Sequence, residues 1–196
     1  MSDEVAVSFA GPFSWPGTPD APSIFDVDEG RGSGIYVWTV PLSEGHLVYY
    51  VGETGRSFAV RHDEHYKEHA AANYHVWSPI EFARGEKIEL WPGRSDHDVT
   101  RRKSVKECIA NYSRLSEPIL KMTYILRFFL APLSCDTRIR RRIEAAIAQA
   151  LYAGPGIVGT FQDRIPYHPR RNDEQPIACI GSSPILLLGM PERFWA

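Results

Sequence analysis

Cysteine is scarce in this sequence, and long apolar runs are missing. The three cysteines, Cys108, Cys135 and Cys179, lie far apart and form no CxxC pair. This pattern argues against a disulfide framework or a cysteine zinc site and favours reduced structural thiols in a cytoplasmic protein. No stretch of eighteen apolar residues occurs, so a membrane-spanning helix is not expected. The acidic start, residues 1–4, lacks the apolar segment of a secretory signal.

A strong charge of one sign is also missing, because the net charge is only −2. This average hides an asymmetry. Residues 1–33 contain six acids and one arginine, a net of −5, which leaves +3 for the remainder. The basic residues of the remainder gather at 101–103, 138–142 and 170–171. Such clusters can attract phosphate groups, or they can form a solvated surface. The charge pattern leaves both interpretations open.

Proline and glycine interrupt the first 33 residues, which contain four of each and no regular period of apolar residues. We interpret residues 1–33 as an acidic, extended arm that wraps the domain and is held by Phe13, Trp15, Ile24 and Phe25. The whole length of 196 residues fits one domain with such an arm.

Two segments rich in β-branched and aromatic residues, 34–40 and 47–51, predict the strands of a hairpin. The residues between them include 43–45, which end in glycine. Ser57 is a suitable cap for a helix from about Phe58 to Ala72.

Further elements follow along the chain. We expect a helix that is capped by Asp136 or Thr137, ends near Tyr152 and is closed by Gly154-Pro155. The other expected elements are a hairpin over 80–90, a helix over 99–115, a buried strand over 122–130 and a short strand over 185–188. This order predicts an α+β fold, a small antiparallel or mixed sheet flanked by helices.

Five sequence features stand in a distinctive order. They are Gly34-Ile35-Tyr36, Tyr50-Val51-Gly52, Arg61 eleven residues after the second tyrosine, His65 one helical turn later, and Glu144 early in a later helix. Together they resemble the GIY-YIG nuclease family, with valine in the middle of the second triplet. The resemblance implies a divalent-metal-dependent endonuclease that hydrolyses phosphodiester bonds in DNA.

The resemblance also divides the chain. It places a GIY-YIG core at 34–153 and leaves a long insertion at 73–119. The C-terminal part, 154–196, is loop-rich, and we expect it to pack on the core. The insertion and this C-terminal part are where we expect substrate selection. The asparagine that the family carries soon after the glutamate has one distant candidate, Asn172.

The residue types suit phosphodiester hydrolysis. A Mg²⁺ or Mn²⁺ ion often takes only one or two protein carboxylates, so Glu144 suffices as metal ligand. Arg61 offers permanently charged donors to phosphate oxygens. The resemblance implies that a tyrosine helps to deprotonate water. We assign that role to Tyr36, a positioning role to Tyr50 and a proton relay to His65.

The two tyrosines must leave the hairpin on one face to serve one phosphate, because side chains alternate along a strand. An odd loop of three residues, 43–45, satisfies this condition. The expected pairs are Val40 with Val48, Trp38 with Tyr50, and Tyr36 with Gly52, and we expect Gly52 to leave room for substrate beside the Tyr36 phenol.

Each residue also has an ordinary structural interpretation. Tyrosines on strands commonly pack in cores, and Glu144 could form an ion pair with Arg140 or Arg141. The spacing of His62, His65 and His69 invites a zinc interpretation, but the spacing and the lack of a cysteine ligand disfavour it.

Two other functions remain open from the sequence. One is a nucleic-acid-binding or regulatory module that has lost catalysis, and the other is a nuclease directed to RNA or to nucleic-acid structure. Because one active site cuts one strand, a homodimer would account for cleavage of both strands.

Overall fold

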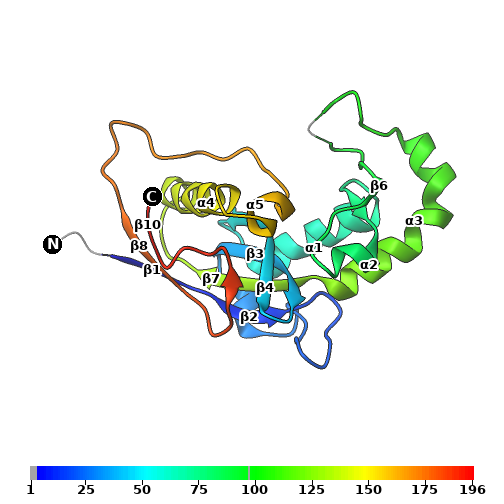
Figure 1. The fold of residues 1–196 in the computed structure, drawn as a ribbon. Helices are drawn as coiled ribbons and strands as arrows, with labels where there is room; N and C mark the ends of the chain where they lie inside the picture. Colours follow the sequence, from blue (N-terminus) through cyan, green and yellow to red (C-terminus); the bar gives the residue numbers. More distant parts are fainter. Residues whose placement is uncertain (1–3, 97) are drawn as a thin grey trace.

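The computed structural model describes residues 4–96 and 98–196, and it confirms an α+β fold (Figure 1). A central five-stranded sheet has the order β2-β7-β3-β4-β9, antiparallel except where β4 meets β9. Its strands are β2 (Ala10–Phe13), β7 (Arg127–Pro132), β3 (Gly34–Leu42), β4 (Gly45–Thr54) and β9 (Leu187–Leu188). None of the described helices is long and apolar enough to cross a membrane.

Smaller elements surround this sheet. A three-stranded sheet is built from β1 (Val5–Ser8), β8 (Ala178–Ser182) and β10 (Arg193–Trp195), and β5 (Val76–Trp77) pairs with β6 (Glu89–Trp91). The helices are η1 (Asp28–Arg31), α1 (Phe58–Ala70), α2 (Pro79–Phe82), α3 (Val105–Ile125), α4 (Thr137–Tyr152) and α5 (Ile157–Phe161).

The central sheet separates two apolar cores. On one face, Tyr36 and Trp38 of β3 pack with residues of α1, α3 and the β5–α2 segment. On the other face, Ile35 and Val37 pack with α4 and with the three-stranded sheet. Alternate residues of β3 therefore serve opposite layers, as the pleat of a strand requires.

The hairpin of β3 and β4 has a different turn from the one expected. Only Ser43 and Glu44 lie between the paired strands, and Val40 pairs with Leu47 rather than with Val48. The register then shifts, so that Tyr49 is unpaired, and the expected pairs of Trp38 with Tyr50 and of Tyr36 with Gly52 are formed.

This β-bulge decides which face Tyr50 occupies. A two-residue turn without a bulge would pair Tyr36 with Val51 and direct Tyr50 away from it. Instead, Tyr49 and Tyr50 both lie in the core of Tyr36, whereas Val48 and Val51 lie in the opposite core. The bulge, and not a three-residue loop as predicted, therefore places Tyr36 and Tyr50 on the same face of the sheet.

Parts of the insertion were predicted wrongly. The expected hairpin over 80–90 is absent from the described residues, where 79–82 are helical and the paired strands are β5 and β6. The helix expected over 99–115 begins at Val105 and continues to Ile125, through Pro118. Residues 122–125 are therefore helical rather than a strand. Their apolar run concealed a helical period, because the buried residues Leu115, Ile119 and Met122 follow one another at spacings of four and three positions.

The N-terminal arm is more regular than expected, since β1 and β2 join two different sheets. Phe13, Trp15 and Ile24 are buried, as predicted, but Phe25 is 44% exposed and is not an anchor. The indole of Trp15 packs against Phe128 and donates a hydrogen bond to the carbonyl of His62. The arm therefore supports the helix that carries Arg61.

Candidate functional site

Tyr36 and Tyr50 lie on one face of the sheet, with ring centroids 6.1 Å apart. Tyr36 is fully buried, whereas Tyr50 is partly exposed. Gly52, opposite Tyr36, does not leave a space for substrate as expected, because the phenol itself fills it. A Cβ atom added at Gly52 would lie 2.5 Å from the Tyr36 hydroxyl. The glycine is what allows this position of the phenol.

Helix α1 brings a guanidinium and an imidazole to the Tyr36 hydroxyl. The Ser57 side chain caps the helix, as predicted, by accepting a hydrogen bond from the amide of Val60. Arg61 Nε then lies 3.3 Å from Tyr36 Oη, and His65 Nε2 lies 2.8 Å from the same oxygen. Arg61 and His65 are one turn apart and serve a single phenol.

The hydroxyl groups form a directed chain. Burial raises the pKa of both tyrosines, and a hydrogen bond with Tyr50 acts on Tyr36 in the opposite sense. Burial lowers the pKa of His65 to about 3, so its imidazole is neutral. With a neutral imidazole, the consistent assignment is that Tyr36 donates to His65 Nε2 and His65 Nδ1 donates to Tyr74, 2.9 Å away, while the Tyr50 ring lies beside the Tyr36 ring.

Glu144 reaches this group from the other side of the sheet. Asp136 caps α4, as predicted, and Glu144 lies in the third turn with 8% of its surface exposed. β9 pairs with β4 at His46 and Leu47, so among the described residues no strand pairs with that edge of β4 at Glu53. The backbone amide of Glu53, farther along β4, donates to the Glu144 carboxylate.

The Glu144 carboxylate is buried and forms no ion pair among the described residues. Burial, and then the charge of Glu53, raise its pKa to about 7 against the weaker opposing charges of Arg141 and Arg61. Arg140 and Arg141, the expected ion-pair partners, instead contact the Glu53 carboxylate at 3.2 and 3.4 Å. Among the described residues no ion pair involves Glu144, although its charge acts on Tyr36 and Tyr50.

This environment fits a hard divalent cation held by one carboxylate. A buried acid that lacks a counter-ion is stabilised when a cation binds. No group of three or more His, Cys, Asp or Glu side chains that could hold a metal occurs in the described part of the chain. Mg²⁺ and Mn²⁺ accept water and phosphate oxygens for their remaining positions, so Glu144 meets their requirement.

The three histidines of α1 have separate environments. His65 binds two tyrosines, His69 Nε2 donates to the carbonyl of Ile119, and neither ring nitrogen of His62 has a hydrogen-bond partner among the described residues. Burial lowers the pKa of His62 and His69. Only His65 contacts the tyrosines by hydrogen bonds, which favours the relay interpretation over a shared metal ligand set.

Asn172 is not brought into the cluster by any described contact. It is exposed, in a turn whose Glu174 forms an ion pair with Arg138 in the first turn of α4. The structure therefore gathers four of the six residues selected from the sequence, Tyr36, Tyr50, Arg61 and His65, in direct contact, and it places Glu144 close enough for its charge to act on both tyrosines. The role of Asn172 remains a prediction.

Two residues of this site were not selected from the sequence. Tyr74 belongs to the insertion, and only the fold brings it to His65. Glu53 directly follows Tyr50-Val51-Gly52, and this position next to the second triplet could have identified it as a residue of the site. A cavity of about 240 Å³ adjoins the cluster and is lined by Tyr50, Arg61 and His65, by residues of the insertion, and by Asp163 and Ile165.

Comparison of the chain with models of known protein families, with curated proteins and with solved structures finds no match.

Replacing Gly52 by alanine tests the packing of Tyr36. The new methyl group must displace the phenol, so we expect the free energy of unfolding to fall by about 1–3 kcal/mol. Thermal denaturation measures this change. Alanine at Gly156, where a Cβ meets nothing within 4 Å, controls for loss of glycine, although its φ of +56° adds some backbone strain. Unchanged stability of Gly52→Ala would contradict the close contact.

Proposed function

We propose that the protein is a divalent-metal-dependent endonuclease of the GIY-YIG type that hydrolyses phosphodiester bonds in DNA. One observation carries the proposal. Two tyrosines, an arginine, a neutral histidine and a buried carboxylate without a counter-ion meet at one end of the β3–β4 hairpin. An ordinary core would not assemble these groups around an uncompensated acid.

The hydroxyl chain supplies a route for the proton of the attacking water. Water beside Tyr50 can pass a proton to that phenol, Tyr50 passes its own to Tyr36, and Tyr36 passes its own to His65 Nε2. His65 stays neutral if Nδ1 releases its proton to Tyr74 at the same time, and Tyr74 returns its own proton to solvent in the cavity. Tyr50 takes the outer position because it lines the cavity, whereas Tyr36 is fully buried. Tyr36 thus keeps its part in water activation, with Tyr50 between it and the water.

Charge stabilisation comes from two sides. Arg61 lines the cavity and holds its guanidinium on the Tyr36 hydroxyl, so its remaining donors can bind phosphate oxygens. A divalent ion bound by Glu144 would act as a Lewis acid toward the phosphoryl oxygen and the leaving group.

The test is incubation of the purified protein with supercoiled plasmid, linear DNA and RNA, in Mg²⁺ or in EDTA. The proposal expects nicked or linear plasmid in Mg²⁺ only. Cleavage of RNA alone would show that the substrate is RNA and not DNA. Binding of nucleic acid without cleavage in Mg²⁺ would identify an inactive nucleic-acid-binding module and overturn the enzymatic proposal.

The basic cluster of α4 gives a further prediction. Arg138 is paired with Glu174 and Arg140 is buried with Glu53, so Arg141, which is half exposed, is the cation of the three best placed for a phosphate. Arg141→Gln should reduce the slope of log affinity against log salt by about one unit. Arg138→Gln is the matched control. Equal slopes for the wild-type protein and both variants would show that the cluster is a solvated surface that does not bind phosphate.

Cellular location and assembly are proposals as well. We propose a cytoplasmic enzyme, in keeping with free cysteines at 108, 135 and 179. Cleavage of both strands by one site per chain would call for a homodimer.

A further inference from the structure

Helix α3 has two apolar faces. One is buried, where Leu115, Ile119 and Met122 lie in the core beside α1, α2 and β5. The other is exposed, and apolar side chains follow one another along it at steps of three and four residues on both sides of a serine. We call this second face the outer face, and its residues are Ile109, Tyr112, Ser116, Leu120 and Tyr124.

The outer face is unusually apolar for an exposed surface. Four of the fourteen large apolar side chains that are exposed in the described part of the chain lie on it. Helix α3 forms the outer edge of the insertion, away from the central sheet (Figure 1). An exposed apolar face of this extent marks an interaction surface.

The two ends of the outer face have complementary shapes. At the C-terminal end, Leu120 and Tyr124 line an open apolar hollow together with Pro79 and Ile80 of α2. At the N-terminal end, the side chain of Ile109 is 72% exposed. One end therefore presents a projecting side chain, and the other end presents a hollow that can receive one.

These features are arranged symmetrically about Ser116. Tyr112 and Leu120 lie four residues before and after this serine, and Ile109 and Tyr124 lie seven and eight residues from it. When two copies of α3 pack antiparallel about a two-fold axis at Ser116, each Leu120 meets the partner's Tyr112, and each hollow receives the partner's Ile109. The small side chain of Ser116 lets the two helices approach each other at the axis.

The charges of α3 fit the same arrangement. Its exposed charged side chains include, in chain order, Glu107, Arg114, Glu117 and Lys121, which alternate in sign. Arg114 and Glu117 lie on either side of Ser116, so antiparallel copies bring Arg114 near the partner's Glu117. A helix with charges of both signs suits a second copy of itself better than an anionic membrane surface, which selects lysine and arginine.

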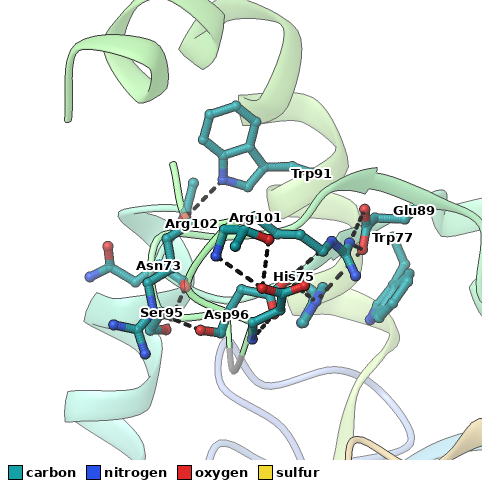
Figure 2. Close-up of polar contacts among 12 residues, drawn as sticks. Asn73, His75, Trp77, Glu89, Trp91, Ser95, Asp96, Arg101 and Arg102 are labelled. Carbon is teal, nitrogen blue, oxygen red and sulfur yellow. Dashed lines mark hydrogen bonds and ion pairs between the residues drawn. The ribbon is translucent and has the colours of Figure 1, made fainter. Parts of the chain in front are cut away.

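The start of α3 is held in place by the segment before it. Arg101 forms an ion pair with Glu89 of β6, and Arg102 Nε donates a hydrogen bond to the carbonyl of Asp96 at 2.7 Å (Figure 2). Ser104 then caps the N-terminus of α3. A face that is already ordered loses little conformational entropy when a partner binds.

We infer that the outer face of α3 binds a second copy of this chain, with the two helices antiparallel and Ser116 at the two-fold axis. This interface supplies a surface for the proposed homodimer, and it does not depend on nuclease activity. The face measures about 24 Å by about 10 Å, which is smaller than the roughly 800 Å² per partner of a standard interface. We therefore expect a weak dimer, with a Kd on the order of 1–100 μM.

Sedimentation velocity of the full chain, without DNA, tests the association. Between about 1 and 200 μM, the mean mass should rise from that of the monomer toward twice that value. Leu120→Glu should raise the Kd at least about tenfold, because it places a charge against the partner's Tyr112. Leu186→Glu is the matched control, since Leu186 lies outside α3 and is 61% exposed, against 57% for Leu120. Ile109→Glu is a second variant if Leu120→Glu fails to fold, as judged by thermal denaturation.

Cysteine cross-linking tests the position of the axis. A residue on a two-fold axis faces its own copy, so Ser116→Cys should form a disulfide between chains on mild oxidation. Ser113→Cys is the control, because its two copies are displaced by about 9 Å along the helices. It should form at least about tenfold less cross-linked dimer. Equal cross-linking of the two variants would overturn the two-fold arrangement.

The remaining outcomes separate this interface from other occupants and from the nuclease. A chain that stays monomeric up to about 200 μM, or equal weakening by Leu120→Glu and Leu186→Glu, would overturn the inference. A monomer that binds phosphatidylglycerol vesicles through Leu120 would also overturn it and identify a lipid-binding face. A monomer that cleaves plasmid keeps the proposed function and loses this interface, whereas a dimer that cleaves no nucleic acid keeps the interface and loses the proposed function.

Discussion

Replacing Glu144 by glutamine is expected to lower the rate of DNA cleavage by about three orders of magnitude while DNA binding is retained. The amide keeps the size of the side chain but removes the anionic ligand for the divalent ion, and with it a major source of charge stabilisation. Cleavage kinetics and a binding isotherm on the same preparation measure the two effects. Unchanged turnover in Mg²⁺ would remove Glu144 from the site.

The same substitution has a second readout that does not require activity. The pKa of Glu144 is raised to about 7 from an ordinary 4.5. Between these pH values the folded protein retains a proton that the unfolded chain has lost, so this group lowers the free energy of unfolding as pH rises. The expected loss is roughly 3 kcal/mol across that interval.

Denaturant unfolding in EDTA at a series of pH values measures this contribution as the difference between the wild-type protein and Glu144→Gln. The wild-type protein should lose stability relative to the variant as pH rises from about 4.5 to 7. Glu117→Gln, on the exposed face of α3, is the control and should follow the wild-type profile. Parallel profiles for wild type and Glu144→Gln would contradict the uncompensated carboxylate.

The second large effect is expected at Arg61. Arg61→Lys should reduce the cleavage rate by about 10²–10³-fold. A planar guanidinium can donate hydrogen bonds to the Tyr36 hydroxyl and to a phosphate at the same time, whereas an ammonium group does not reproduce this geometry. The decrease should appear in kcat more than in KM, since the lost interaction strengthens in the transition state.

Arg56→Lys is a matched control for this substitution. Arg56 and Arg61 both bind the Glu64 carboxylate, but only Arg61 contacts Tyr36. We therefore expect Arg56→Lys to leave the cleavage rate within a few-fold of wild type. Equal losses in the two variants would show that both act through Glu64 and would argue against a phosphate-binding role for Arg61.

The parts of the fold that could be predicted are those with a helix cap or a dense run of strand-forming residues. Ser57 and Asp136 cap the helices that the sequence predicted, and the strands of the hairpin lie where β-branched and aromatic residues are dense. The bulge at Tyr49 could not be predicted from the turn. Its side chain is held by a hydrogen bond from Trp77, so the register depends on a residue far along the chain.

The candidate site divides in the same way. Tyr36, Tyr50, Arg61, His65 and Glu144 were selected because their order resembles a family pattern, and the structure brings them together. Tyr74 could not be selected, because its contact with His65 depends on the path of the insertion. The long helix α3 was misplaced for a related reason, since its C-terminal turns resemble a strand until their buried face is known.

The most direct test of metal-dependent hydrolysis at this site is the rate of plasmid nicking as a function of free Mg²⁺. The measurement begins with EDTA-stripped protein and holds ionic strength constant. We predict no nicking without the ion and a saturating increase in rate with Mg²⁺, absent in Glu144→Gln. A rate that is independent of Mg²⁺, or no cleavage at any concentration, would contradict the proposed function.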